Sequence, residues 1–162
     1  MTRRAAKFWV LIFDISLLSG CLSLSADQFA QSIFVDLAYT KVLAFKSRIK
    51  TPHGCSYLVL ELPEDTEVAP PVPVFPDYVG PSERVWASTL DAQNVEINSR
   101  HPCLILEPEK FDWAGVAGFS SQITTILKQQ GAWFVRSGGV EGIELVVYAP
   151  QDRLAVYLRF GD

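Results

Sequence analysis

Apolar residues between positions 25 and 50 recur at steps of three and four, which predicts one helix with one apolar face over residues 25–50. The recurring residues are Phe34, Leu37, Ala38, Val42, Phe45 and Ile49. Ser25 and Gln28 form a Ser-x-x-Gln capping-box pattern at the start of this segment. Pro52 follows directly after it, where a helix is expected to end. A second helix is predicted for residues 119–130, because their apolar residues share a face and Gly131 follows.

The C-terminal part changes to strand patterning. Residues 132–136, 143–148 and 153–160 are predicted strands, the last with strict alternation of apolar residues. Ser137-Gly138-Gly139 and residues 149–152 are the expected turns between them. Because such short connections join antiparallel strands, we predict a C-terminal three-stranded meander.

The middle of the chain predicts one further clear strand and a long loop. Residues 56–62 form the clear strand, while residues 84–90, 95–98 and 103–107 predict shorter ones. Residues 63–81 contain six prolines, so this stretch is expected to be a stiff Pro-rich surface loop. We expect Val72, Val74 or Phe75 to pack against the rest of the domain. Together the elements predict a single α+β domain over residues 21–162, with two helices packed on an antiparallel sheet.

Composition and charge narrow the function classes. The chain has 162 residues and a formal charge of −4, and it has no basic run beyond its first few residues. Nucleic acid is therefore not an expected partner, since phosphate contacts need clustered Lys and Arg. Three cysteines are too few for a disulfide scaffold and form no dense zinc motif.

The N-terminus has the three parts of a secretory signal peptide. Arg3, Arg4 and Lys7 give a basic start, residues 8–18 are mostly apolar, and Leu18-Ser19-Gly20-Cys21 follows. This last tetrapeptide resembles the lipobox of bacterial lipoproteins. The resemblance implies removal of residues 1–20 as a lipoprotein signal peptide and acylation of Cys21, by groups such as palmitate, which would anchor the protein in the lipid bilayer. The competing interpretation is a buried N-terminal helix of a cytosolic protein, to which Asp14 within the apolar run points.

Export would leave an acidic mature protein in the cell envelope. Cleavage before Cys21 removes three basic residues and one acidic residue, which changes the formal charge from −4 to −6. Attraction to anionic lipid by charge is then not expected, so the acyl chains would supply the anchoring. Leu22 follows Cys21. In the lipoproteins that this segment resembles, an Asp at this position favours retention in the inner membrane. The resemblance thus favours the outer membrane, with the domain facing the periplasm.

Two His-x-Cys pairs, His53-Gly54-Cys55 and His101-Pro102-Cys103, are the main candidates for chemistry. A disulfide between Cys55 and Cys103 is our first interpretation, because an exported chain enters an oxidising compartment. A metal site formed by His53, Cys55, His101 and Cys103 is the second, although this spacing is unusual for structural zinc. A Cys/His nucleophile pair is the third, without any supporting motif.

Other candidate residues favour structure over catalysis. Gly115 and Gly118 precede a helix and could expose N–H groups to an anion, but a helix entry explains them as well. Three acidic residues lie in a polar connection and three tryptophans suit the core. These residues are Glu107, Glu109, Asp112, Trp86, Trp113 and Trp133.

The sequence therefore predicts a non-enzymatic envelope lipoprotein without a cofactor. Its expected partner is an envelope protein or a cell-wall component, and toxin immunity, phage exclusion and assembly assistance all fit. The competing hypothesis is a small tethered metal or redox protein, or a hydrolase, that uses His53, Cys55, His101 and Cys103.

Overall fold

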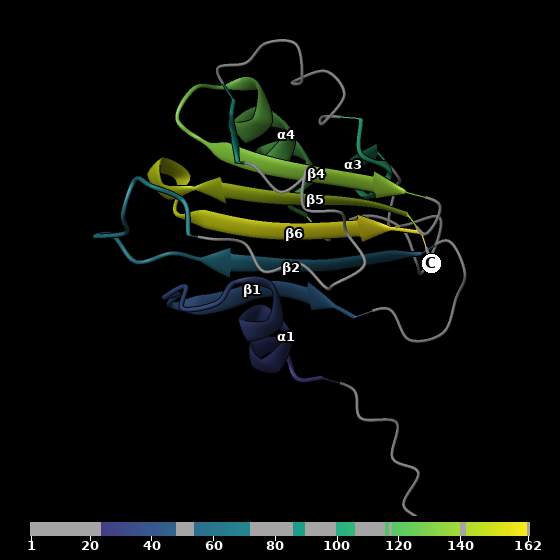
Figure 1. Cartoon of the computed structure of the whole chain (residues 1–162), viewed down its shortest axis with the longest axis horizontal. Coiled ribbons are helices and arrows are strands. Elements are labelled where there is room, and N and C mark those ends of the chain that lie inside the picture. Colours follow the sequence, from purple (N-terminus) through teal and green to yellow (C-terminus); the bar gives the residue numbers. More distant parts are fainter. Residues whose placement is uncertain are drawn as a thin grey trace, which may run out of the picture.

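The computed structural model describes residues 24–47, 54–71, 86–89, 100–105, 116, 118–139 and 142–161. Its described strands form one antiparallel sheet in the order β1-β2-β6-β5-β4-β3 (Figure 1). The strands are β1 (Lys41–Lys46), β2 (Cys55–Glu61), β3 (Ala87–Ser88), β4 (Trp133–Gly139), β5 (Gly142–Ala149) and β6 (Leu154–Phe160). The described helices are α1 (Ala26–Ile33), α3 (Pro102–Ile105), α4 (Ser120–Lys128) and the 3-10 turn η2 (Pro150–Asp152). The predicted α+β class is confirmed.

The centre of the sheet is apolar on both faces. Val59 of β2, Val156 of β6 and Val147 of β5 lie opposite one another across the three central strands. All three are fully buried, and their neighbours along each strand are buried on the other face. Burial on both faces explains why these strands are nearly continuous runs of Val, Leu and Tyr.

Each face of the sheet is covered by helices. One core contains apolar side chains of α3 and α4, including Leu104, Ile123 and Ile126. The core on the other face contains Ala30 and Ile33 of α1. Figure 1 shows α3 and α4 on one side of the sheet and α1 on the other.

The single helix predicted for residues 25–50 is wrong beyond Ile33. The capping box is present, since Gln28 N–H donates to Ser25 Oγ and Ser25 N–H donates to Gln28 Oε1. The helix then ends, Asp36 adopts a left-handed conformation with φ of 59°, and the chain continues as β1. Asp is one of the residue types that tolerate this conformation best.

Four of the six residues predicted to share a helix face nevertheless lie in or against one core, whereas Ala38 is exposed and Ile49 lies outside the described residues. Phe34 belongs to the core on the α1 face, and Leu37, Val42 and Phe45 pack against it. They arrive there from a turn and a strand, because pairing of β1 with β2 overrides the helical spacing. Periodicity thus identified most of the residues that face the core and assigned the wrong local structure beyond Ile33.

The strand predicted for residues 103–107 is also wrong, since Pro102–Ile105 is helix α3. Pro102 occupies the first helical position, where its missing N–H has no cost. The next N–H, of Cys103, donates to Nδ1 of His101 at 3.2 Å. A proline followed by a side-chain cap therefore starts a helical turn at this point.

The remaining predicted elements lie close to the observed ones. The clear strand at 56–62, the helix at 119–130 and the strands at 132–136, 143–148 and 153–160 correspond to β2, α4, β4, β5 and β6. The turn predicted at Ser137-Gly138-Gly139 is wrong, since these residues complete β4. Of the strand predicted at 84–90, Ala87–Ser88 is β3. The strand predicted at 95–98 lies outside the described residues.

Candidate functional site

Cys55 and Cys103 form a disulfide, as the first interpretation of the His-x-Cys pairs predicts. Cys55 begins β2 and Cys103 lies in α3, and their Cα atoms are 5.6 Å apart across a sequence separation of 48 residues. Both side chains are buried in the core on the α3–α4 face. The bond therefore joins a central strand to a helix of only four residues.

His101 lies beside this disulfide and is buried, with 2% of its surface exposed. Its Nδ1 accepts the N–H of Cys103, so its proton resides on Nε2, which donates to the carbonyl of Ile143 at 3.2 Å. Desolvation, with a smaller contribution from Arg136, lowers the pKa of His101 from 6.5 to about 4. The ring is thus a neutral cap whose two nitrogens are both engaged.

The groups that the metal and nucleophile interpretations require are not available in this arrangement. Oxidised Cys55 and Cys103 supply no thiolate, which both interpretations require. His101 has no lone pair left for a metal or a proton, and His53 lies outside the described residues. The four-residue set could act only after reduction of the disulfide and rotation of His101.

Several other predicted residues also lie outside the described part of the chain. They are Cys21, Val72, Val74, Phe75, Glu107, Glu109, Asp112, Trp113 and Gly115. Trp86 and Trp133 are described and pack against the core on the α1 face, as expected. Within the described residues, no helix is both long and apolar enough to span a membrane.

A buried polar cluster on the α1 face was missed by sequence reasoning. Glu144 of β5 accepts hydrogen bonds from the Tyr157 hydroxyl at 2.9 Å and the Ser137 hydroxyl at 3.2 Å. Arg159 forms an ion pair with the same carboxylate at 3.5 Å. A single Glu inside the apolar strand Gly142–Ala149 was the available signal. Because the carboxylate is bonded on both oxygens, the cluster locks three neighbouring strands together.

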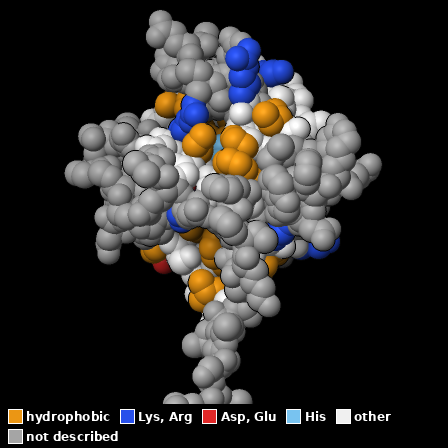
Figure 2. Space-filling view, turned by 90° about the vertical axis from the view of Figure 1, so that its right-hand side faces the viewer, with side chains coloured by type: hydrophobic (Ala, Val, Ile, Leu, Met, Phe, Trp, Pro, Cys, Tyr) orange, Lys and Arg blue, Asp and Glu red, His pale blue; other side chains and the backbone are white. Residues whose placement is uncertain are grey.

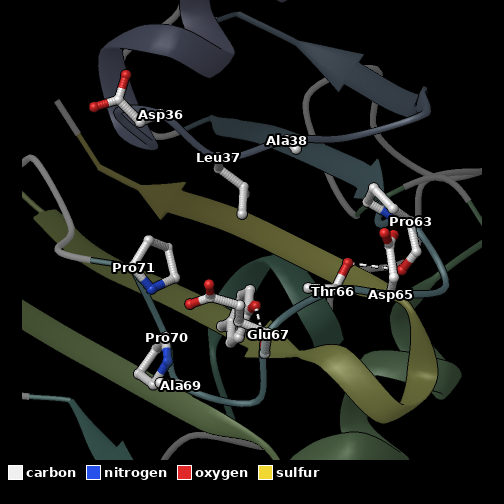
Figure 3. Close-up of a pocket in the computed structure, with 11 residues that line it drawn as sticks. Asp36, Leu37, Ala38, Pro63, Asp65, Thr66, Glu67, Ala69, Pro70 and Pro71 are labelled. Carbon is white, nitrogen blue, oxygen red and sulfur yellow. Dashed lines mark hydrogen bonds between the residues drawn. The ribbon is translucent and has the colours of Figure 1, made fainter.

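A pocket of about 400 Å³ opens at the other end of the α1 face (Figure 3). One side is the connection between α1 and β1, with Asp36, Leu37 and Ala38. The other side is the described part of the Pro-rich loop, residues 63–71, which we call the proline loop. Tyr148 of β5 lies between them. We call this cavity the acidic pocket because three of its lining residues are carboxylates, namely Asp36, Asp65 and Glu67.

Side-chain hydrogen bonds fix the proline loop along its length. Arg153 donates to the carbonyl of Leu62 and forms ion pairs with Glu61 and Glu64 at 3.1 and 3.2 Å. The Tyr148 hydroxyl donates to the carbonyl of Glu67, and the Trp86 indole donates to the carbonyl of Pro71 at 2.7 Å. Prolines cannot hold a loop through their own nitrogens, so these side chains replace the missing backbone bonds.

The opposite side of the acidic pocket is also fixed. The Tyr39 hydroxyl donates to Asp27 Oδ1 at 2.6 Å, which ties the connection back to α1. The N–H of Thr40 donates to the carbonyl of Glu61 at 2.8 Å, at the point where the proline loop begins. Both sides of the cavity are therefore held by hydrogen bonds within the protein itself.

The three carboxylates of the acidic pocket have no counter-charge among the described side chains that bond to them. None of its three carboxylates makes an ion pair or side-chain hydrogen bond with another described residue. Desolvation, followed by the charge of Glu67, raises the pKa of the Tyr148 phenol, which stays protonated and keeps its bond to the loop. In Figure 3 the Glu67 carboxylate lies over the centre of the pocket, while that of Asp36 points outward at its rim.

No protein-family model matches the chain, and neither does any curated protein or solved structure.

Proposed function

We propose that this chain is an exported lipoprotein, anchored through acylated Cys21, whose domain serves as a non-enzymatic binding or accessory protein in the bacterial envelope. The proposal treats residues 21–162 as one α+β domain, with helices packed on a sheet that ends in a three-stranded meander. Leu22 after Cys21 favours the outer membrane, with the domain facing the periplasm.

The buried Cys55–Cys103 disulfide carries the structural support. Disulfides persist in oxidising compartments and are rare where thiols are kept reduced. The only other cysteine of the chain is Cys21, which lipidation would consume, so no thiol would remain free. A signal peptide with a lipobox and a disulfide thus agree on the compartment through independent chemistry.

The short spacing between Cys21 and α1 limits how far the domain could lie from the membrane. Ser25, the cap of α1, follows Cys21 by four residues, which span at most about 14 Å when fully extended. An acylated Cys21 would therefore hold the start of α1 close to the lipid headgroups. The expected partner, an envelope protein or a cell-wall component, would meet the domain at the membrane surface.

Binding rather than catalysis is supported by what the described side chains offer. His101 is capped on both nitrogens, and the Glu144 carboxylate is bonded on both oxygens. The described lining residues of the acidic pocket include no Ser, Cys, His or Lys, and the hydroxyls of Thr66 and Tyr148 are engaged in bonds to the carbonyls of Pro63 and Glu67. A preformed cavity of this size falls within the usual range for small-ligand sites of about 300–1,000 Å³.

The test compares the wild-type chain with Cys21→Ala and, as a matched control, Ser19→Ala, which keeps a small residue before the cysteine. Intact-mass spectrometry of native protein should show wild type and Ser19→Ala starting at Cys21 with added acyl mass, in the membrane fraction. The Cys21→Ala variant should remain an uncleaved precursor that still carries residues 1–20 and has no acyl mass. An unacylated wild-type chain in the cytoplasmic fraction would contradict the proposal.

A further inference from the structure

We infer that the acidic pocket binds a small organic cation with an aliphatic body. The inference deepens the binding part of the proposed function and is independent of the lipid anchor. It starts from the cavity itself, which is fixed on both sides by hydrogen bonds of Tyr148, Trp86, Arg153 and Tyr39. A cavity that exists before binding does not have to be ordered by its ligand, so less affinity is lost on association.

The lining of the pocket selects the class of ligand. Apolar surface comes from Leu37, Ala69, Pro70 and Pro71, and Figure 3 shows the Leu37 side chain pointing toward Glu67 across the pocket. This apolar surface suits an aliphatic chain. Among the described lining residues there is no Lys or Arg that would compete with an incoming cation. A carboxylate bound to an ammonium group forms a charge-assisted hydrogen bond, which is stronger than a neutral one.

Charge is distributed unequally between the two ends of the sheet. Lys46 ends β1 and Arg159 lies near the end of β6, both at the end opposite the pocket. Figure 2 looks onto that opposite end, where the visible charged side chains are mostly Lys and Arg. The three pocket carboxylates lie at the other end, where β2 finishes and β1 begins. Lys41 and Arg153 also lie at the pocket end, but Arg153 is paired with Glu61 and Glu64. Carboxylates therefore outnumber cations among the described residues at this end, which favours a cation.

The volume of the site limits the ligand to a small molecule. A volume of about 400 Å³ is near the lower end of the range for ligand pockets. Primary or secondary amines with a short methylene chain match this volume, since the ammonium group can face Glu67 or Asp65 while the chain covers Leu37. The carboxylates would repel an anion, and a neutral ligand could hydrogen-bond to them but would leave their charge uncompensated.

The experiment is isothermal titration calorimetry of the full chain with its disulfide formed, using 1,5-diaminopentane as the probe. Pentane-1,5-diol is the matched neutral probe, because it has the same chain with uncharged ends. We expect saturable binding of the diamine and at least about tenfold weaker binding of the diol. Equal affinities for the two probes, or no saturable heat with the diamine, would overturn the inference.

Variants locate the binding within the molecule. Glu67→Gln should weaken diamine binding by about tenfold, since it removes the central charge without changing shape. Asp152→Asn is the control, because Asp152 is an exposed carboxylate in η2 and is not among the described residues that line the pocket. Equal losses in both variants would show diffuse attraction to an acidic protein and refute the site. An unchanged acyl mass on Cys21 alongside absent binding would refute the pocket and leave the lipoprotein proposal standing.

Discussion

His101 shows at the scale of one residue how the fold fixes a charge state. Its ring caps α3 through Nδ1 and reaches Ile143 on β5 through Nε2, so it joins a helix to the sheet. Protonation would place a positive charge in a buried site next to Arg136 and would remove the lone pair that caps Cys103. The imidazole is therefore a structural part of the fold in its neutral form.

This burial predicts a dependence of stability on pH. The pKa of His101 is near 6.5 in the unfolded chain and about 4 in the folded one, so the unfolded state binds its proton first as the pH falls. The contribution of His101 is complete above about pH 6.5 and decreases toward pH 4, by about 3 kcal/mol in all. Urea unfolding at a series of pH values should show this decrease.

The His101→Asn variant isolates the effect, because Asn can still accept the N–H of Cys103 and does not titrate. Between pH 6.5 and pH 4 its free energy of unfolding should fall less steeply than that of the wild type by about the same 3 kcal/mol. Parallel curves for the two proteins would show that His101 does not contribute to the acid sensitivity.

At the scale of the element, α1 depends on its cap because it has only eight residues. Isolated helices of this length do not form in water, so packing on the sheet and capping must stabilise it. Ala30 and Ile33 provide the packing, and the reciprocal bonds of Ser25 and Gln28 provide the cap. The helix in turn holds Tyr39 through Asp27, on one side of the acidic pocket.

Replacing Ser25 by Ala should therefore lower the free energy of unfolding by about 1 kcal/mol, since the N–H of Gln28 loses the hydroxyl oxygen that accepts its hydrogen bond. Ser32→Ala is the control, because its hydroxyl bonds back to the carbonyl of Phe29 and contributes no cap. Urea titrations of both variants measure the difference. A loss in Ser32→Ala as large as in Ser25→Ala would contradict the capping argument.

At the scale of the whole molecule, the disulfide limits how far the unfolded chain can expand. It closes a loop across 48 positions that includes β2, the proline loop and β3. A loop of this length corresponds to about 4 kcal/mol in the chain-entropy description. The same bond attaches the four-residue helix α3 to β2.

Cys55→Ala combined with Cys103→Ala should accordingly lower the free energy of unfolding by about 4 kcal/mol. Dithiothreitol should destabilise the wild type by a comparable amount and leave the double variant unchanged. Urea midpoints with and without reductant make the comparison. A wild-type midpoint that does not respond to reductant under unfolding conditions would indicate that the two thiols are not joined in the purified protein.

The sequence alone determined most of the described apolar core, since apolar spacing responds to burial whatever the local backbone does, and it did not reveal the buried polar residues such as Glu144. It identified β2, α4 and the C-terminal strands, where pattern and local preference agree. The Cys55–Cys103 pair could be predicted because only two cysteines remained once Cys21 was assigned to lipid. The capping box at Ser25 was predictable because it is a contact between residues three apart.

Only the tertiary structure decided whether an ambiguous segment formed a helix or a strand. It also decided which polar groups from distant parts of the chain came into contact. Residues 41–46 became a strand because β2 offered an edge, and residues 102–105 became a helix because His101 capped Cys103. The acidic pocket joins residues 36–38, the proline loop and Tyr148, which are far apart in sequence. No local pattern records such contacts, because their energy arises only when the chain has brought the segments together.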